Sequence, residues 1–355
     1  MLQKLVIRAD ASPQMGTGHV MRCLALAQAW QDEGGEVLFV SAESSPAVER
    51  RLEAEGIQLT LLPEVLPGSL EDAQRTVIPA QKYGACWIVI DGYHFGAAYQ
   101  KYLKEAGFSL LFWDDNGRAE HFYADFIINQ NIHAKASLYQ SREPYTQLLL
   151  GTSYAVLRRE FWPWRDWKRA IPEKAKNILV TMGGSDPDNV TLKVVQALQQ
   201  IEDSDLQVVV IVGGSNPHYP SLKAAVEACG ESIKLRRNVT DISDLMAWAD
   251  LAISAAGSTC WELAFMGVPS LLLVLAENQE RAADYLYKEN IAVSLGSMKW
   301  VDSPTIVSNV ISLVTNPRLR EEMSSRGASL VDGFGVKRVI TSLGEPRYEK
   351  ERLLN

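Results

Sequence analysis

Residues 4–30 read KLVIRADASPQMGTGHVMRCLALAQAW and join an apolar strand, a glycine-rich turn and a helix. The segment KLVIRA has the length and apolar character of a buried strand. Gly16 and Gly18 permit a tight turn and the close approach of a ligand, and we expect the helix to begin at about His19. Continuously apolar strands that alternate with helices are typical of a parallel sheet covered on both faces, so this stretch predicts an α/β fold.

The alternation of strands and helices continues on both sides of residues 157–176, LRREFWPWRDWKRAIPEKAK, where the pattern breaks. Strands are predicted at 4–9, 37–42, 58–62, 87–91, 110–114 and 126–129, then at 177–182, 207–212, 234–237, 251–254, 270–274 and 292–295. Helices are predicted at 19–33, 46–55, 189–200, 219–229, 242–249, 259–266 and 279–289. We therefore predict an N-terminal Rossmann-like domain (1–156), a linker (157–176), a C-terminal Rossmann-like domain (177–330) and a helical tail (331–355). The tryptophans of the linker favour packing between the domains over stacking on a ligand.

Length and composition are those of a globular enzyme with two domains. The chain has 355 residues, of which 47% are hydrophobic and 22% charged. Its formal net charge of −8 argues against broad binding of nucleic acid or anionic membranes, although a local site can still accept a small anion.

The cysteines and the N-terminal segment predict a cytoplasmic protein. Cys23, Cys86, Cys229 and Cys260 form no C-x-x-C pair, and most have apolar neighbours, so we expect buried free thiols. The chain shows no signal-peptide pattern and no apolar run near the roughly 20 residues that span a bilayer. The sequence predicts no membrane insertion and leaves the oligomeric state open, a monomer included.

His19 is the strongest catalytic candidate. The first-turn amides of the helix are unpaired and favour an anion, and His19 and Arg22 share one helix face near that mouth. One alternative is a dinucleotide fingerprint with Glu43 as the ribose acid, but the third glycine would fall on Met21, where close packing is required. Another is that His19 only caps the helix. We favour a general base.

Polar residues follow the other strands of the first half. The carboxyl ends of parallel strands meet at one edge, so we expect these residues to lie on the same rim as His19. They are Asp10, Asp91, Tyr93, Asp114, Asp115 and Asn129. For Asp114 and Asp115, capping of the next turn is an equal alternative. Adjacent acids alone do not make a metal site, so we predict neither a metal nor a cofactor.

Two turns of the second half are candidate phosphate cradles. Gly183-Gly184-Ser185 follows the strand predicted at 177–182, and Gly257-Ser258-Thr259 opens the helix predicted at 259–266. Glu262 lies one turn into that helix and can accept hydrogen bonds from a ribose. The alternative is a capping box from Thr259 to Glu262, which needs no ligand. Asn278 and Gln279 end an apolar strand at the same cleft, which faces the carboxyl ends of both sheets.

Taken together these motifs resemble a known family. The pattern G-S-T-x-x-E-x-x-x-x-G-V-P at 257–269, with Asn-Gln after the next strand, is similar to the nucleotide-binding half of glycosyltransferase-B folds, especially the UDP-GlcNAc transferase of lipid II synthesis. The ordered set narrows the resemblance to the UDP-sugar hydrolase of pseudaminic acid biosynthesis and to related spore-coat polysaccharide proteins, up to about residue 340. That set is Arg8-x-Asp10-x-Ser12, Gly16-x-Gly18-His19-x-x-Arg22, Asp91-x-Tyr93, Asp114-Asp115, Gly151…Tyr154-Ala155-x-Leu157-Arg158-x-Glu160-Phe161 and Gly183-Gly184-Ser185-Asp186.

The resemblance implies two Rossmann-like domains in a glycosyltransferase-B arrangement and a role for each matched residue. His19 would activate water, Tyr93 and Asn278 would line the sugar pocket near the anomeric carbon, and the backbone of Val239 would lie near uracil. The candidate ligand-binding residues are Asp10, Gly16, Gly18, Arg22, Asp91, Asn129, Gly183, Gly184, Ser185, Val239, Gly257, Ser258, Thr259, Glu262 and Gln279.

The implied reaction is inverting hydrolysis of UDP-2,4-diacetamido-2,4,6-trideoxy-β-L-altropyranose to UDP and the free sugar. A glycosyltransferase with an acceptor in place of water, and a catalytically silent UDP-sugar sensor, are the two alternatives.

Overall fold

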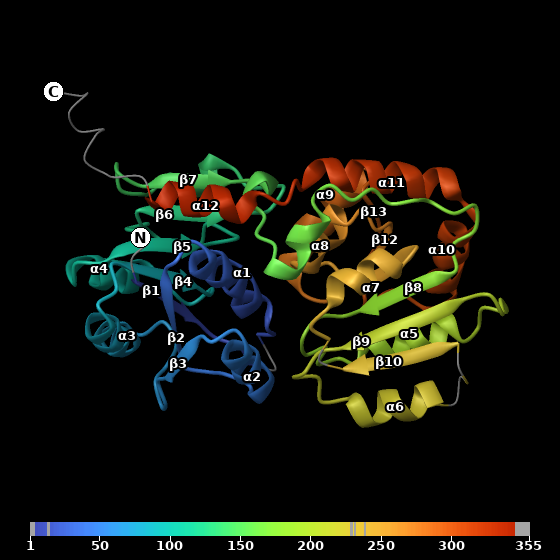
Figure 1. The fold of residues 1–355 in the computed structure, drawn as a ribbon, viewed down its shortest axis with the longest axis horizontal. Coiled ribbons are helices and arrows are strands. Elements are labelled where there is room, and N and C mark those ends of the chain that lie inside the picture. The colour runs from blue at the N-terminus through green and yellow to red at the C-terminus, as the bar shows by residue number, and fades with distance from the viewer. Residues whose placement is uncertain (1–3, 13–14, 228–229, 231, 238, 345–355) are drawn as a thin grey trace.

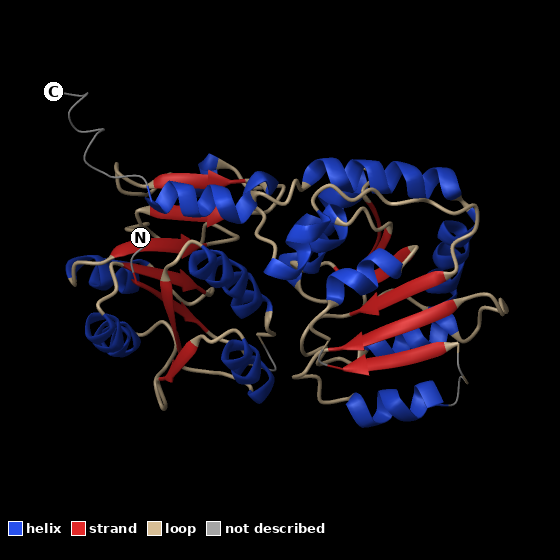
Figure 2. Ribbon diagram, in the orientation of Figure 1, coloured by secondary structure: helices blue, strands red, loops and turns tan. Residues whose placement is uncertain are grey.

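The computed structural model describes residues 4–12, 15–227, 230, 232–237 and 239–344. The end of the helix predicted at 219–229, Cys229 and the polar end of the predicted tail lie outside these residues. The described chain forms two lobes side by side, each built on one parallel sheet with helices packed around it (Figures 1 and 2). The predicted α/β fold is confirmed.

The first lobe contains a seven-stranded sheet in the order β3-β2-β1-β4-β5-β6-β7, and every pair is parallel. Its strands are β1 (Lys4–Ala9), β2 (Glu36–Ser41), β3 (Gln58–Leu61), β4 (Trp87–Asp91), β5 (Ser109–Trp113), β6 (Phe126–Asn129) and β7 (Gln147–Leu150). Its helices are α1 (Gly18–Asp32), α2 (Pro46–Ala54), α3 (Leu70–Tyr83) and α4 (Ala97–Glu105), with short 3-10 helices η1 (Ala136–Tyr139) and η2 (Thr152–Tyr154).

The second lobe contains a six-stranded parallel sheet in the order β10-β9-β8-β11-β12-β13. Its strands are β8 (Asn177–Thr181), β9 (Gln207–Val212), β10 (Ile233–Arg237), β11 (Leu251–Ala255), β12 (Ser270–Val274) and β13 (Ala292–Ser297). Its helices are α5 (Val190–Leu198), α6 (Tyr219–Glu227), α7 (Ile242–Trp248), α8 (Thr259–Phe265), α9 (Glu280–Lys288), α10 (Ser303–Thr315) and α11 (Pro317–Leu330), with η4 (Glu277–Gln279).

Each sheet is buried on both faces, as its apolar strands require. In β1, Leu5 and Ile7 belong to one core cluster of the lobe, and Val6, between them, belongs to another on the opposite face. The central strands of the second lobe divide in the same way, with Ile178 and Leu179 in different clusters. The two cores fix the strand ends, and these carry the residues of the cleft.

The chain crosses between the lobes twice. The first crossing contains η3 (Arg159–Trp164), where Trp162 packs against the core of the first lobe and Trp164 against that of the second. The second crossing leads to α12 (Gly335–Gly344), which lies on the first lobe beside α1 (Figure 1). There it buries Val336 and Val339 in the same core as α1.

Local differences from the sequence analysis have simple causes. The predicted strands and helices are present, with ends shifted by one or two residues where they are described. The four-residue edge strand β7 and the helices α3 and α4 lie outside the predicted ranges. Cys23 and Cys260 are buried, but Cys86 is exposed, because it lies in the turn that precedes β4. No helix of the described residues is long and apolar enough to cross a membrane.

Candidate functional site

A cavity of about 640 Å³ lies between the lobes and has walls from both. Most predicted site residues line it: Gly16, Gly18, His19, Arg22, Tyr93, Gly183, Gly184, Ser185, Val239, Gly257, Ser258, Thr259, Glu262, Asn278 and Gln279. Asp10, Asp91 and Asn129 are fully buried and lie behind its wall. None of the linker tryptophans borders the cavity.

The turn between β1 and α1 places His19 at the cavity. Gly16 has φ +79°, a conformation that side chains other than glycine rarely adopt. The helix then begins at Gly18, and its N-cap residue Thr17 makes no side-chain hydrogen bond to it. The first-turn amides therefore remain available to a ligand. His19 itself is only 6% exposed.

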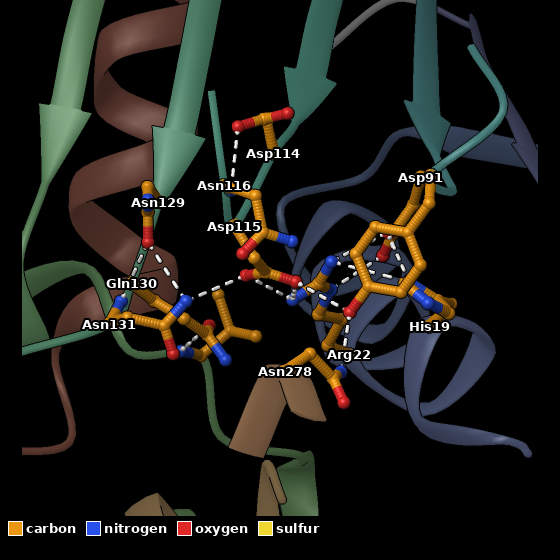
Figure 3. Close-up of polar contacts among 12 residues, drawn as sticks. His19, Arg22, Asp91, Asp114, Asp115, Asn116, Asn129, Gln130, Asn131 and Asn278 are labelled. Atoms are coloured by element: carbon orange, nitrogen blue, oxygen red, sulfur yellow. Dashed lines mark hydrogen bonds and ion pairs between the residues drawn. The ribbon is translucent and has the colours of Figure 1, made fainter. Parts of the chain in front are cut away.

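His19 and Arg22 both bind the carboxylate of Asp91 at the end of β4 (Figure 3). The Nδ1 of His19 lies 2.6 Å from Asp91 Oδ1, while Arg22 donates from Nε to Oδ2 at 2.6 Å and from Nη2 to Oδ1 at 2.7 Å. Burial raises the pKa of Asp91, but Arg22 and His19 outweigh it and hold the pKa well below its usual value. An ionised carboxylate can only accept, so in the neutral ring the hydrogen is on Nδ1 and Nε2 keeps a lone pair, as a general base needs.

Tyr93 connects this group to the second lobe. Its hydroxyl donates to Asp115 Oδ2 at 3.4 Å and accepts from Asn278 Nδ2 at 2.8 Å. Burial and the charge of Asp115 raise the pKa of Tyr93 to about 12, so the hydroxyl keeps its proton. Its ring packs edge-on against the His19 ring, with centroids 4.8 Å apart. The structure therefore brings the three predicted catalytic residues together.

Asp115 and Asn131 extend the network. Asp115 borders the cavity with His19, as predicted for the strand ends, whereas Asn131 is not among the predicted residues. Arg22 Nη1 donates to both carboxylate oxygens of Asp115, at 2.9 and 3.0 Å, and Asn131 Nδ2 donates to Oδ1 at 2.8 Å (Figure 3). Asp114 instead accepts the backbone N–H groups of Asn116 and Gly117, so the turn-capping alternative is confirmed for it. Asn131 lies two residues beyond β6. The expectation that polar residues after a strand lie on the rim would have included it, had it been extended to the second residue after the strand.

Asp10, Asp91 and Asn129 are corrections to the expectation that every strand-end polar residue reaches the rim, because none of the three borders the cavity. Asp10 accepts from Arg8 at 2.6 Å and from the Ala42 backbone at 2.7 Å. Burial raises the pKa of Asp10, but His94 and Arg8 outweigh it and hold the pKa well below its usual value. Asn129 is held between Tyr139 and Asn131. All three side chains bind partners within the protein and have no surface on the cavity.

The start of α8 contradicts the capping-box alternative. Ser258 is the N-cap residue but has helical φ and ψ angles of −59° and −24°, and no side chain caps the helix. A capping residue needs an extended backbone, so its hydroxyl cannot reach back to the first amides. Glu262 accepts from Arg158 at 2.9 Å, and burial raises the pKa of Glu262. Ser258 and Thr259 thus border the cavity, and the N-cap side chain of Ser258 makes no capping hydrogen bond.

The glycine turns of the two lobes face each other across the cavity. A Cβ atom on Gly184 would lie 2.2 Å from Thr17 Oγ1, and one on Gly18 would lie 3.7 Å from Ser258 Oγ. Gly183 has φ +85°, while Asp186 turns back to cap α5 through the N–H of Val190 at 2.8 Å. Within the described ranges, no group of three or more His, Cys, Asp or Glu residues could hold a metal ion.

Sequences similar to this chain include proteins whose names refer to UDP-sugars. Residues 177–336 match the glycosyltransferase family 28 C-terminal domain, which is therefore present in the chain. A spore coat polysaccharide biosynthesis protein of Bacillus subtilis is 27% identical over 97% of this chain and 98% of its own. The UDP-2,4-diacetamido-2,4,6-trideoxy-β-L-altropyranose hydrolase of Campylobacter jejuni is 28% identical over 82% of this chain and 98% of its own. The predicted resemblance is confirmed.

Other similarities concern length and fold. An uncharacterized protein of Methanocaldococcus jannaschii is 27% identical over 83% of this chain, which spans only 60% of that relative's length. Among solved structures, MurG of Acinetobacter baumannii has a TM-score of 0.66 at 17% identity and covers 96% of this chain and 98% of its own. A spinosyn rhamnosyltransferase bound to thymidine diphosphate has a TM-score of 0.68 at 15% identity, with 97% and 100% covered. The two sheets thus have the predicted glycosyltransferase-B arrangement.

Proposed function

We propose, from the glycosyltransferase family 28 C-terminal domain in residues 177–336 and the His19–Asp91 pair that faces it, that the chain is an enzyme that hydrolyses a UDP-linked amino sugar. The single observation that carries the proposal is the 2.6 Å contact between His19 Nδ1 and Asp91 at the wall of the interlobe cavity. The names of the Bacillus subtilis and Campylobacter jejuni relatives support UDP-2,4-diacetamido-2,4,6-trideoxy-β-L-altropyranose as the substrate and surface polysaccharide synthesis as the context.

The proposed mechanism is one inverting displacement. Nε2 of His19 accepts a proton from water as its oxygen attacks the anomeric carbon, and the bond from that carbon to the β-phosphate oxygen breaks with its electron pair on UDP. Asp91 holds the ring and stabilises the imidazolium that forms. Backbone amides and hydroxyls at Gly257, Ser258 and Thr259 bind the departing diphosphate, so we propose that no metal ion is required.

Replacement of His19 by Ala tests the base. We expect kcat to fall by about 10²- to 10⁴-fold, because the attacking water loses its proton acceptor, while UDP affinity changes little. The measurement is UDP and free-sugar release followed by NMR in the presence and absence of EDTA, with no acceptor added. Near-normal release by His19→Ala would refute the assignment of the base.

Glycosyl transfer is the second candidate, favoured by the fold shared with MurG and the spinosyn rhamnosyltransferase. In that case water is replaced by an acceptor hydroxyl, and the same base serves. The wild-type protein would then release UDP only when an acceptor is supplied, so accumulation of free sugar without one separates the two reactions.

A further inference from the structure

The loop that follows β6 forms a polar wall of the cavity to which the mechanism above assigns no part. Gln130, Asn131 and His133 come from this loop and all border the cavity. We call these three residues the amide wall. Their hydrogen bonds within the protein determine which of their polar atoms remain available to a ligand.

Asn131 presents a hydrogen-bond acceptor. Its backbone N–H donates to Asn129 Oδ1 at 3.1 Å, which fixes that atom as oxygen. The Nδ2 of Asn131 then donates to the same Asn129 oxygen at 2.9 Å and to Asp115 Oδ1 at 2.8 Å, and so uses both of its hydrogens. Because an amide has two donor hydrogens on nitrogen and lone pairs on oxygen, only Oδ1 of Asn131 remains for a ligand.

Gln130 presents a donor. Its side chain is 2% exposed, and its Oε1 accepts the backbone N–H of Val156 at 3.2 Å, which fixes the orientation of the amide. Among the described residues none accepts a hydrogen bond from its Nε2. The two hydrogens of that nitrogen are therefore available at the cavity.

His133 presents a second donor. The ring is 8% exposed and stacks on Tyr285 of α9, with centroids 6.0 Å apart and planes inclined by 26°. Its Nδ1 is buried and has no partner within the described chain. Burial and the charge of Arg281 lower the pKa of His133, so the ring is neutral. An orphaned N–H group is rarer than an orphaned acceptor, so the hydrogen belongs on Nε2.

From this inventory we propose that the amide wall recognises an acylamino group on the sugar, which deepens the proposed function and rests on it. A secondary amide donates one N–H, matching Asn131 Oδ1, and its carbonyl accepts from Gln130 Nε2 and His133 Nε2. A carboxylate would leave the Asn131 oxygen unpaired, and an ammonium would leave both donors unpaired. Each such mismatch costs a buried hydrogen bond.

A hydroxyl has the same number of donors and acceptors, but the surroundings favour the acyl group. Ala282 of α9 borders the cavity one helical turn before Tyr285, on the helix face that His133 covers. This places a small apolar surface beside the donors, where the methyl of an acetyl group would pack. Gln130, Asn131 and His133 are therefore specificity-determining residues.

Gln130→Glu tests the proposal, because the carboxylate still accepts the Val156 N–H but cannot donate to a carbonyl. The assay compares kcat/KM for the diacetamido donor with kcat/KM for counterparts in which one acetamido group is replaced by a free amine or by a hydroxyl. We expect kcat/KM for the acetamido UDP-sugar, divided by kcat/KM for the amine UDP-sugar, to fall by about 10- to 100-fold. The reason is that the acetamido carbonyl loses its hydrogen bond from Gln130, whereas the ammonium gains a carboxylate partner. His133→Phe keeps the stacking on Tyr285. It should lower kcat/KM for the acetamido UDP-sugar relative to kcat/KM for the hydroxyl UDP-sugar.

Gln28→Glu is the matched control. Gln28 is 1% exposed, its Oε1 accepts the Arg159 backbone N–H at 2.9 Å, and it does not border the cavity. Its ratios should equal those of the wild type. The proposal would be overturned if Gln130→Glu lowered kcat/KM equally for all three UDP-sugars. It would also be overturned if the wild type preferred the hydroxyl UDP-sugar.

Failure of the proposed hydrolysis would appear differently, as absence of free sugar from the wild type with every donor. Calorimetric affinities for the three donors then decide the amide wall alone. Weaker binding of the acetamido UDP-sugar by Gln130→Glu, without an equal loss for the amine and hydroxyl UDP-sugars, supports it, and a uniform change or none contradicts it.

Discussion

At the residue scale, the central feature is one carboxylate, that of Asp91, which orients both the imidazole of His19 and the guanidinium of Arg22. Asp91 is fully buried, accepts from His19 and Arg22, and also receives the Cys23 thiol at 3.4 Å. Arg22 also donates to Asp115, and Asp115 accepts a further hydrogen bond from Asn131 in the loop after β6. The orientation of the His19 ring is thus set by residues from α1, from the end of β4 and from the loops after β5 and β6.

Asp91→Asn tests whether this carboxylate positions the base. The amide can turn its NH2 toward Nδ1 and favour the wrong tautomer, so we expect kcat to fall by about 10²- to 10⁴-fold with KM little changed. Nitrogen chemical shifts of the His19 ring should show the exchange of tautomers. As a control, Asp125→Asn removes the charge from a partly buried pair with Lys104, neither of which borders the cavity, and should lower stability without changing kcat. An unchanged kcat in Asp91→Asn would contradict the positioning role.

At the element scale, helix starts differ in whether their hydroxyls stabilise the helix or border the cavity. Ser69 caps α3 by accepting the Asp72 N–H at 3.1 Å, whereas no side chain caps α8. The same residue types therefore have different roles, and only the backbone angles of Ser258 reveal which.

Thr259→Val should separate these roles. Loss of a hydroxyl that binds phosphate should weaken UDP binding by about 10-fold, with the melting temperature nearly unchanged, because no cap is removed. Ser69→Ala should do the reverse, costing about 1 kcal/mol of unfolding free energy and leaving UDP affinity intact. Calorimetry and thermal melts check both. A lower melting temperature with unchanged UDP affinity in Thr259→Val would refute the assignment.

The sequence predicts the elements well because apolar runs such as 87–91 and 270–274 are buried on both faces and need no tertiary information. It also predicts the two glycine turns, whose backbone requirements are local. The sequence does not predict which of several possible partners a polar side chain binds. Asp10 and Asp91 both lie at the ends of central strands and both are buried behind the cavity wall, but Asp10 pairs with Arg8 whereas Asp91 orients His19, and only the packed structure reveals that difference.

At the scale of the whole molecule, the site is complete only when both lobes meet. Tyr93 of the first lobe and Asn278 of the second share a hydrogen bond, and Ser45 and Ser215 form another across the cleft at 3.0 Å. The narrow gap between Thr17 and Gly184 sets the closest approach of the two glycine turns.

Gly184→Ala should hold the lobes apart. Its Cβ would meet Thr17 Oγ1 at 2.2 Å, so we expect kcat/KM to fall by about 10-fold while the melting temperature of the protein changes little. Thr17→Gly in the same chain removes the obstructing side chain and should restore most of the loss. Small-angle scattering with UDP present measures the separation. Full activity of Gly184→Ala, or no rescue by Thr17→Gly, would contradict this account.

The return of α12 to α1 makes the second lobe topologically an insertion into the first, since β1 and α12 belong to the same body. Two covalent connections, rather than one, must bend whenever the cleft opens, which restricts the motion to rotation about a line through both. Labels placed in β1 and in α12 would therefore report on the same lobe. A distance probe of cleft opening must have one of its two labels at an internal position of the second lobe.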